Sequence, residues 1–195
     1  DTVILMDPDT RVVVDRESFE RAVYQFQQSG ANASSVQLMP YNTDNLVSKL
    51  QVLEYQKSMT FGRGSLREES IVSGGFALFK RETIRDVLDM HSGEQTGEDF
   101  ELSLDILNMG GRISHIDEVI AQTEVPNTFG DLWKQRVIWG EADITVQWKF
   151  LFSPKKSLKY LYNQYIYNLG LSTLLQPLKI ASMPLLLTSL VNAGD

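Results

Sequence analysis

SGGFALFKRE, residues 73–82, is the stretch that says most about the architecture of this chain. Its apolar run ends in charged residues, so residues Ile71 to Phe79 predict a strand. The residues that follow, Arg81 to Met90, have the pattern of a helix. Gly74 and Gly75 would let the backbone approach a ligand closely, and a close-packed bend in the strand would explain the same glycines.

Apolar runs and helical patterns alternate on both sides of this stretch. We expect further strands at residues 2–6, 36–39, 112–116 and 120–124, and further helices around residues 19–26, 46–59, 98–109 and 128–147. Residues 2–6 form a short apolar run of the kind found in buried parallel strands. Strands that alternate with helices indicate an α/β architecture.

Capping signals mark where three of these helices begin. Asp15 precedes the first helix, Asp44 or Asn45 precedes the second, and Thr128-Phe-Gly-Asp131 resembles a capping box before the last. The second helix is expected to be amphipathic. Its apolar positions are Leu46, Leu50, Leu53 and Met59.

The composition excludes several classes of site. The chain has no cysteine, which rules out disulfides, thiolate zinc sites and cysteine nucleophiles. With only His91 and His115 present, a histidine-rich metal site is also disfavoured. Any metal would have oxygen ligands, which favours magnesium, manganese or calcium. The net charge of −7 argues against binding of nucleic acid by the body of the chain.

The last fifty residues differ in charge from the rest. Between Ile144 and Gly194 there is no Asp or Glu, although five lysines occur there. This basic, aromatic segment is expected to contact anionic lipid headgroups. Residues 169–191 are mostly apolar, but the charge-free part, 180–191, is too short to span a bilayer. An interfacial helix, the broken start of a membrane helix and a buried surface helix all fit this pattern.

Asp7-Pro8-Asp9 follows the first apolar run and forms a D-x-D motif. Two carboxylates at the end of a strand can converge on one hard cation. Nucleotide-sugar transferases use such a pair to hold a metal on the donor diphosphate. Haloacid-dehalogenase-type phosphatases use the first Asp as a nucleophile, but they usually have Thr or Val where Arg11 stands. An ordinary acidic turn would also leave this pattern.

Several motifs then follow one another along the chain. After SGGFALFKRE come TGEDFELSL at 96–104, GGRI at 110–113, TEVP at 123–126 and QRVIW at 135–139, and LEY at 53–55 precedes them all. Their order and spacing resemble the inverting family 2 glycosyltransferases, particularly the cellulose, chitin, hyaluronan and poly-N-acetylglucosamine synthases. The resemblance covers roughly residues 1–150, and the motifs are specific in combination, although each alone is weak.

The resemblance implies a GT-A-like fold, with a mixed sheet flanked by helices. Residues 1–148 would form the metal and acceptor side of the catalytic domain, and sequence upstream would supply the nucleotide-binding part. By their composition rather than by the resemblance, residues 149–195 would form a basic, aromatic interfacial segment and a possible membrane helix, amphipathic or apolar. We therefore expect residues 1–195 alone to bind a nucleotide sugar weakly.

The resemblance also implies roles for single residues. Asp7 and Asp9 would hold a divalent metal, Mg or Mn, and Asp99 would be the general base of the G-E-D motif. Inverting transfer needs such a base, because the attacking acceptor hydroxyl must lose its proton. Glu98 and residues Ser73 to Gly75 would contact the donor or the acceptor. Without the other motifs, Glu98 and Asp99 would be ordinary acids in the first turn of a helix.

The QRVIW stretch matches the family motif Q-x-x-R-W except at one position. Trp139 would offer an aromatic surface to the acceptor sugar, and Gln135 would help to arrange the site, although a Trp buried against the sheet fits too. Arg136 is expected to contact the donor or the acceptor. Ile138 stands where the family has the Arg that reaches the diphosphate. Lys134, one turn earlier, is closer in angle to Ile138 than Arg136 is.

The expected function is metal-dependent, inverting transfer of a hexose or N-acetylhexosamine. The donor would be a nucleotide diphosphate sugar, and the acceptor a glycan or a lipid-linked sugar. The catalytic domain would lie on the cytoplasmic side of the cell membrane, in contact with membrane lipid and without a nucleic-acid partner. Because of Ile138, a non-catalytic or regulatory module of the same fold is the main alternative, and a phosphatase is the third.

Overall fold

The stretch SGGFALFKRE forms a strand that is buried on both faces and leads directly into a helix. In the computed structural model, which describes residues 1–57, 68–69, 71–91, 93 and 97–152, these elements are β5 (Phe76–Lys80) and α3 (Arg81–Leu88). Phe76 and Leu78 join one hydrophobic cluster, and Ala77 and Phe79 join another. Successive side chains of a strand point to opposite faces, so β5 contributes to the core on both sides of the sheet.

The sheet around β5 is mixed. Its order is β1-β5-β3-β6-β2, with β4 pairing separately with β6. β3 and β6 run parallel, and the other pairs are antiparallel. The strands are β1 (Thr2–Met6), β2 (Arg11–Val13), β3 (Ala33–Pro40), β4 (Glu68–Glu69) and β6 (Ile113–Thr123). A mixed α/β fold of this kind fits the GT-A-like domain that the resemblance implied.

β1 lies at the edge of this sheet, and the expectation of a buried parallel strand was wrong. It pairs with β5 in antiparallel orientation, the only pairing it makes among the described strands. Ile4, Leu5 and Met6 are 38–50% exposed. A run of five apolar or small residues cannot distinguish a central strand from an edge strand, because position in the sheet depends on distant partners.

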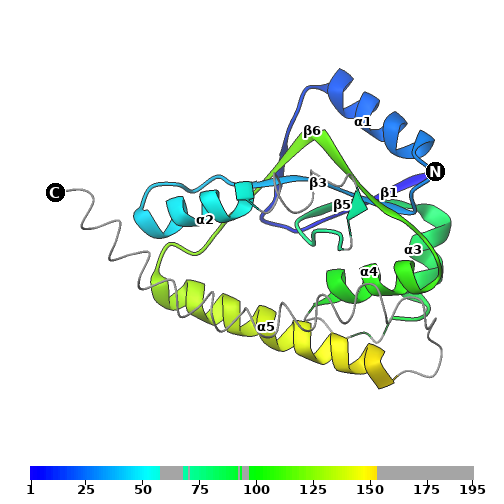
Figure 1. Cartoon of the computed structure of the whole chain (residues 1–195). Helices are drawn as coiled ribbons and strands as arrows, with labels where there is room; N and C mark the ends of the chain where they lie inside the picture. The colour runs from blue at the N-terminus through cyan, green and yellow to red at the C-terminus, as the bar shows by residue number, and fades with distance from the viewer. Residues whose placement is uncertain (58–67, 70, 92, 94–96, 153–195) are drawn as a thin grey trace. The chain divides into compact units, whose positions relative to one another are not determined.

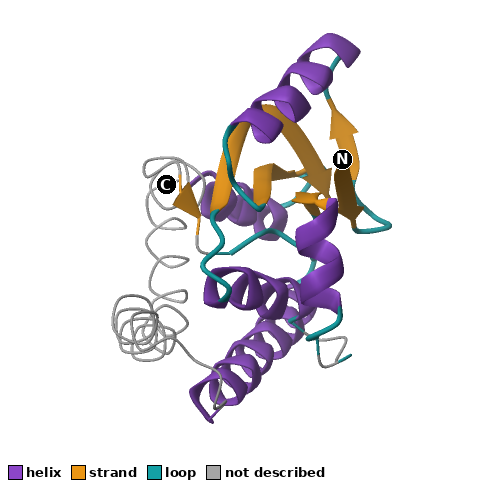
Figure 2. Ribbon diagram, turned by 90° about the vertical axis from the view of Figure 1, so that its right-hand side faces the viewer, coloured by secondary structure: helices purple, strands orange, loops and turns teal. Residues whose placement is uncertain are grey.

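Helices cover both faces of the sheet (Figures 1 and 2). α1 (Arg16–Gln28) begins at Asp15, whose carboxylate accepts a hydrogen bond from Ser18 N, as its capping signal predicted. Ala22 and Phe26 pack from α1 into the cluster that contains Phe76. On the other face, α3 and α4 (Glu98–Asn108) pack into the cluster that contains Phe79.

The helix α2 (Leu46–Lys57) buries a different face from the one expected. Asn45 caps it by accepting a hydrogen bond from Ser48 N. Leu46 and Leu53 are more than half exposed, whereas Ser48 and Gln51 are buried. The amide of Gln51 donates to Pro126 O at 2.8 Å, so a polar contact attaches this face to the chain before α5. Met59 lies outside the described residues.

Residues 113–123 form one strand, β6, rather than the two expected at 112–116 and 120–124. β6 pairs with β3 along its length, but the register shifts between Val36 and Gln37. At this shift, three residues of β6, 117–119, have no partner in β3, as in a β-bulge. The end of α4 is as expected, since Gly110 has a positive φ of 81° that favours glycine.

The longest helix is α5 (Phe129–Phe152). Asp131 N donates to the Thr128 hydroxyl, and the same hydroxyl donates to the Asp131 carboxylate. The predicted start is therefore confirmed, although in a standard capping box the acid accepts from the backbone instead. None of the described helices, α5 included, combines the length and apolarity needed to cross a membrane.

The described residues belong to a single compact unit, Asp1–Phe152. The expectations for residues 153–195, an interfacial or membrane helix with basic flanks, concern residues outside those described. Residues 58–67 and 70 also lie outside those described, whereas Glu68 and Glu69 form β4.

Substitutions on the two faces of β5 should cost similar amounts of stability. Phe76→Ala and Phe79→Ala each remove a ring that is at most 2% exposed, and each should lower the free energy of unfolding by about 3–5 kcal/mol. Phe129→Ala, which removes a half-exposed ring from α5, is the matched control and should cost less than about 1 kcal/mol. Urea unfolding measures all three. A large cost on one face alone would contradict the two-sided core.

Candidate functional site

The first part of the site is the turn after β1. Asp7 N donates a hydrogen bond to Gly75 O at 3.2 Å, and Thr10 N donates to Asp7 O at 3.0 Å. The turn is therefore attached to the start of β5 and closed upon itself. Asp7 is half-buried and Asp9 is exposed, so the two carboxylates of the D-x-D motif lie at the surface of the sheet's edge.

The second part is Asp99, at the beginning of α4. Its Oδ2 accepts a hydrogen bond from Gly74 N at 3.0 Å, and its Oδ1 accepts one from Phe100 N at 2.8 Å. A Cβ at Gly74 would lie 3.2 Å from Oδ2, which is tighter than most such contacts. Glycine at this position therefore lets the backbone approach the carboxylate. Gly74 and Gly75 together bring Asp99 and the D-x-D turn to one place.

The electrostatics agree with this arrangement. The pKa of Asp7 is raised above its ordinary value, chiefly by burial and then by the charges of Asp9, Glu98 and Asp99. Each of these charged neighbours is an acid, so the four carboxylates repel one another. A cation among them would relieve that repulsion.

The described residues supply few metal ligands at any one point. Among them, no three His, Cys, Asp or Glu side chains converge on a position where they could hold a metal ion. The D-x-D pair can therefore offer one or two carboxylates at most. Magnesium is often bound in this way, by one or two carboxylates together with substrate phosphates and water.

Buried serines hold the strand and helix of the site in place. Ser103 Oγ donates to Asp99 O at 2.5 Å and accepts from Val72 N at 2.9 Å. Ser73 N donates to Ser35 Oγ at 3.3 Å, and Ser73 itself is buried. The backbone of Ser73 is thus part of the scaffold, while its expected contact with a sugar stays a prediction.

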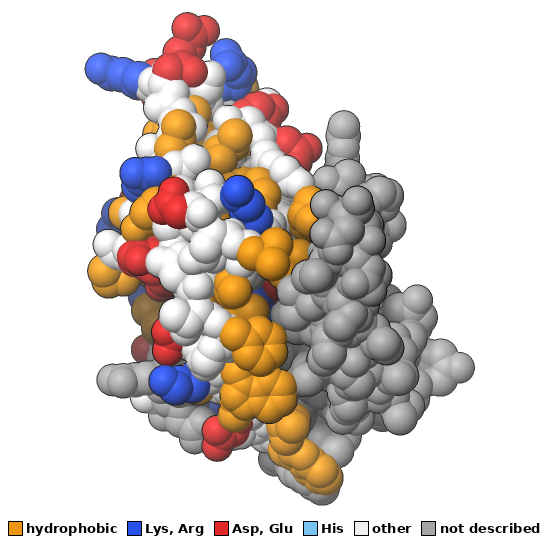
Figure 3. Space-filling model, turned by 90° about the vertical axis from the view of Figure 1, so that its left-hand side faces the viewer, with side chains coloured by type: hydrophobic (Ala, Val, Ile, Leu, Met, Phe, Trp, Pro, Cys, Tyr) orange, Lys and Arg blue, Asp and Glu red, His pale blue; other side chains and the backbone are white. Residues whose placement is uncertain are grey.

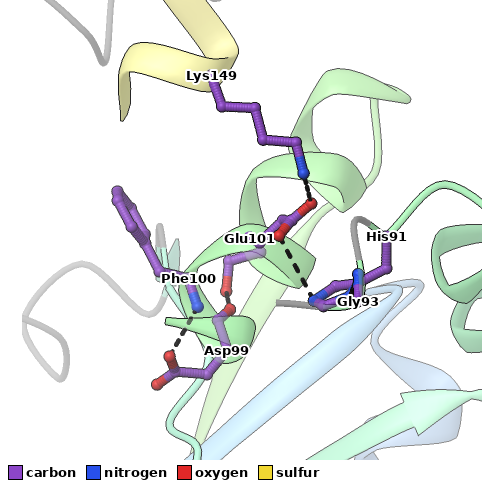
Figure 4. Close-up of polar contacts among 7 residues, drawn as sticks. His91, Gly93, Asp99, Phe100, Glu101 and Lys149 are labelled. Atoms are coloured by element: carbon purple, nitrogen blue, oxygen red, sulfur yellow. Dashed lines mark hydrogen bonds and ion pairs between the residues drawn. The ribbon is translucent and has the colours of Figure 1, made fainter. Parts of the chain in front are cut away.

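A second anchor holds the first turn of α4 from the other side. Glu101, which is 2% exposed, accepts a hydrogen bond from Lys149 at the end of α5, and its Oε2 lies 3.6 Å from His91 Nε2. Figure 4 shows Glu101 between Lys149 and His91, while Asp99 points away from them. Because Gly93 N donates to His91 Nδ1, a neutral His91 carries its proton on Nε2, facing Glu101.

Close packing also joins α5 to α4. A Cβ at Gly97 would lie 2.9 Å from Ala142 Cβ, and the φ of Gly97 is +79°. At about 100° per residue, Gln135, Trp139 and Ala142 lie on one face of α5. The helix that carries the Q-x-x-R-W positions therefore packs against the residue just before Glu98 and Asp99.

The Q-x-x-R-W positions have distinct surroundings. Gln135 Oε1 is buried and has no hydrogen-bond partner among the described residues. Arg136 pairs with Glu54 of α2 and stacks on the ring of Trp139. Ile138 is 52% exposed. Lys134 pairs with Asp131, so it is engaged at the start of its own helix.

Sequence reasoning missed the residues that support the site. Glu101 and Lys149 are 48 positions apart, and Glu54 and Arg136 are 82 apart. No local pattern connects such pairs. The stretch Leu53-Glu-Tyr55 was noted only as part of the resemblance, and that was the one signal for Glu54.

Asp105 lies one turn after Glu101 and is also buried. Its Oδ2 has no hydrogen-bond partner among the described residues. Burial, and next the charge of Glu101, raise the pKa of Asp105 to about 6, while Lys149 and His91 act in the opposite direction. The charged form of Asp105 is therefore poorly accommodated in the folded chain.

Comparison with known proteins identifies a family. Residues 2–193 match the model for "Glycosyl transferase family group 2". A poly-beta-1,6-N-acetyl-D-glucosamine synthase from Staphylococcus aureus (strain COL) is 28% identical over 170 residues, which is 82% of this chain and 39% of the relative. An N-acetylglucosaminyltransferase from Neorhizobium galegae is 26% identical over 153 residues, 73% of this chain and 35% of the relative. The chain thus spans under two fifths of the length of these relatives.

Asp105→Asn should stabilise the protein at neutral pH. Because the pKa of Asp105 is higher in the folded than in the unfolded chain, its contribution to stability is present below about pH 4 and is lost as the pH rises through about 6. The variant should gain about 1 kcal/mol at pH 7–8, and the gain should shrink towards pH 4.5. Urea unfolding across this range measures it.

Asp86→Asn, on α3, is the control and should leave the pH dependence of stability unchanged. A gain for Asp105→Asn that did not vary with pH would show that the carboxylate does not titrate as described.

Proposed function

We propose, from the premise that this chain belongs to glycosyl transferase family group 2, that the complete protein is a metal-dependent, inverting glycosyltransferase. It moves a hexose or N-acetylhexosamine from a nucleotide diphosphate sugar to a glycan or lipid-linked acceptor. One observation carries the proposal: consecutive residues of one loop bind the two halves of the site, Gly74 N to Asp99 and Gly75 O to Asp7 N.

Asp99 acts as the general base. The acceptor hydroxyl oxygen forms a bond to the anomeric carbon, its proton passes to the Asp99 carboxylate, and the bond from that carbon to the diphosphate oxygen breaks. Two features support this role. The first turn of a helix favours the ionised carboxylate, and the hydrogen bond from Gly74 N fixes its direction.

Asp7 and Asp9 are the residues that would hold a divalent cation, Mg or Mn. When bound there, the cation supplies positive charge that neutralises the leaving diphosphate. The raised pKa of Asp7, with three other acids as its charged neighbours, supports a site in which a cation belongs. Glu98, which is exposed beside Asp99, is proposed to contact the donor or the acceptor.

Trp139 and Gln135 form the acceptor side. Trp139 is 44% exposed, so part of the indole is open to a sugar ring. Gln135, on the same face of α5, has a buried amide oxygen with no hydrogen-bond partner among the described residues, and we propose that it helps to arrange the site. The two relatives named above are described by N-acetylglucosamine chemistry, which favours an N-acetylhexosamine as the transferred sugar.

We place the protein at the cell membrane, with the catalytic part in the cytoplasm. A stripe on α5 supports contact with lipid, because its members lie on one face and are each about half exposed. They are Phe129, Trp133, Val137, Ile144 and Trp148. Figure 3 views the molecule from the side where α5 begins and shows hydrophobic side chains gathered in a band. Aromatic residues with nearby lysines are typical of an interfacial surface.

The alternative is a non-catalytic or regulatory module of the same family. Ile138 favours it, because the exposed position where the family motif has Arg carries an apolar side chain that cannot bind a diphosphate. Lys134 does not obviously replace the missing charge, since it pairs with Asp131. The family match gives no support to the phosphatase reading of Asp7.

Replacing the base should abolish transfer. In the full-length protein, Asp99→Asn should lower the transfer rate by about 10²–10⁴-fold, while the Kd for the nucleotide sugar changes less than about threefold. Release of nucleoside diphosphate in the presence of Mg or Mn measures the rate, and calorimetry measures binding. The control Asp86→Asn should behave as wild type. Transfer that survives in Asp99→Asn would overturn the base assignment.

Restoring the motif arginine separates the catalytic reading from its alternative. If the protein is an active transferase limited by weak diphosphate contact, Ile138→Arg should raise kcat/KM for the donor by about tenfold, as one charge-assisted phosphate contact does. Thr145→Arg adds the same charge at another exposed position of α5, outside the apolar stripe, and should have little effect. If neither wild type nor Ile138→Arg releases nucleoside diphosphate, the non-catalytic module becomes the better reading.

A further inference from the structure

Arg136 makes two contacts of different kinds. Its Nη2 lies 2.7 Å from Glu54 Oε2, and its Cζ lies 4.2 Å from the centre of the Trp139 ring. The arginine side chain is 20% exposed, and Glu54 comes from α2, far away in the sequence. A planar guanidinium can hydrogen-bond at its edge while its face lies on an aromatic ring, which lysine cannot do equally well.

These contacts leave Arg136 poorly suited to bind a diphosphate. Its charge is already balanced by Glu54, so a phosphate would have to displace a charge-assisted hydrogen bond. Arg136 is also roughly 200° around the helix from position 138, where the family motif has its arginine. Arg136, two residues before the motif position, is therefore engaged in a different contact.

The effect of the two contacts falls on Trp139. A partly exposed Trp on a helix can adopt several rotamers, and each bound sugar would then have to select one of them. Arg136, three residues earlier on the same helix, covers one face of the indole. Glu54 in turn holds Arg136 from α2, so the orientation of the ring is fixed by two elements rather than one.

We propose that Glu54 and Arg136 are positioning residues that hold the Trp139 ring in the orientation in which it receives the acceptor sugar. This rests on the proposed function, in which Trp139 is the acceptor surface. Glu54 acts through Arg136, and neither residue contacts the donor. The contacts from Glu54 to Arg136 and from Arg136 to Trp139 thus attach α2 to the acceptor side of the site.

Steady-state kinetics of the full-length protein test the effect on the substrate. Arg136→Ala and Glu54→Gln should each raise the acceptor KM by about tenfold and leave the donor KM within about twofold, as expected for loss of one stacking contact. Arg136→Lys should be intermediate, and the double variant should be no worse than Arg136→Ala. Arg16→Ala, which breaks the exposed Arg16–Glu20 pair on α1, is the control. A raised donor KM with an unchanged acceptor KM would overturn the proposal.

Tryptophan fluorescence tests, without relying on activity, whether Arg136 and Glu54 hold the Trp139 ring in one orientation. The full-length protein is used with Trp133→Phe, Trp148→Phe and Phe in place of any tryptophan outside residues 1–195, so that Trp139 alone reports. Arg136→Ala and Glu54→Gln should lower the fluorescence anisotropy of Trp139 and raise its quenching by acrylamide about twofold, while Arg16→Ala should do neither. Unchanged fluorescence would overturn the proposal.

The two experiments together separate this proposal from the one on which it rests. Altered fluorescence with an altered acceptor KM supports both. Altered fluorescence with normal kinetics of an active enzyme would confirm that Glu54 and Arg136 hold the Trp139 ring, and it would overturn their role in acceptor binding. Altered fluorescence in a protein that transfers no sugar would reject the proposed function. It would still show that Glu54 and Arg136 hold the Trp139 ring.

Discussion

The two-sided burial of β5 is the constraint on which the rest of this structure depends. A strand with Phe76 and Leu78 on one face and Ala77 and Phe79 on the other must have helices on both sides, and α1 and α4 provide them. Once β5 is held in this way, the two glycines before it have a fixed position. Gly75 O then receives the D-x-D turn, and Gly74 N receives Asp99. The hydrophobic core thus determines where the carboxylates of the site meet.

The helix α5 is attached to the rest of the described residues by polar contacts and by a few buried apolar residues. Lys149 reaches Glu101 near its end, Arg136 reaches Glu54 nearer its start, and between them Ala142 packs closely on Gly97. Besides Ala142, the apolar side chains of Leu132 and Val146 are buried along α5, at 3% and 2% exposure. These contacts leave the apolar stripe of α5 at the surface, and they hold the helix that carries Gln135 and Trp139 against the start of α4.

The features that could be predicted from the sequence are those that depend on residues close to one another in the chain. The cap at Asp15 and the stop at Gly110 depend on a few neighbouring residues, and the structure has both where the pattern placed them. The direction of β1 and the buried face of α2 depend on partners far along the chain, and both predictions were wrong. In α2, Gln51 faces inward and donates to Pro126 O, while Leu46 and Leu53 are exposed. For the site, the order of the motifs and the family resemblance indicated Asp99 and the D-x-D pair. The ion pairs of Glu101 with Lys149 and of Glu54 with Arg136 could not be predicted, because their partners lie far apart in the sequence.

The exposed edge of β1 has a practical consequence for work with residues 1–195 alone. Three apolar side chains, Ile4, Leu5 and Met6, lie along a strand whose outer backbone groups have no strand partner among the described residues. An edge of this kind is a template for pairing between molecules, because it carries neither the charge nor the proline that usually prevents such pairing. The strand ends one residue before Asp7, so self-association there would occlude the turn that carries the carboxylates. A preparation that has aggregated through β1 would therefore appear inactive for a reason unrelated to its chemistry.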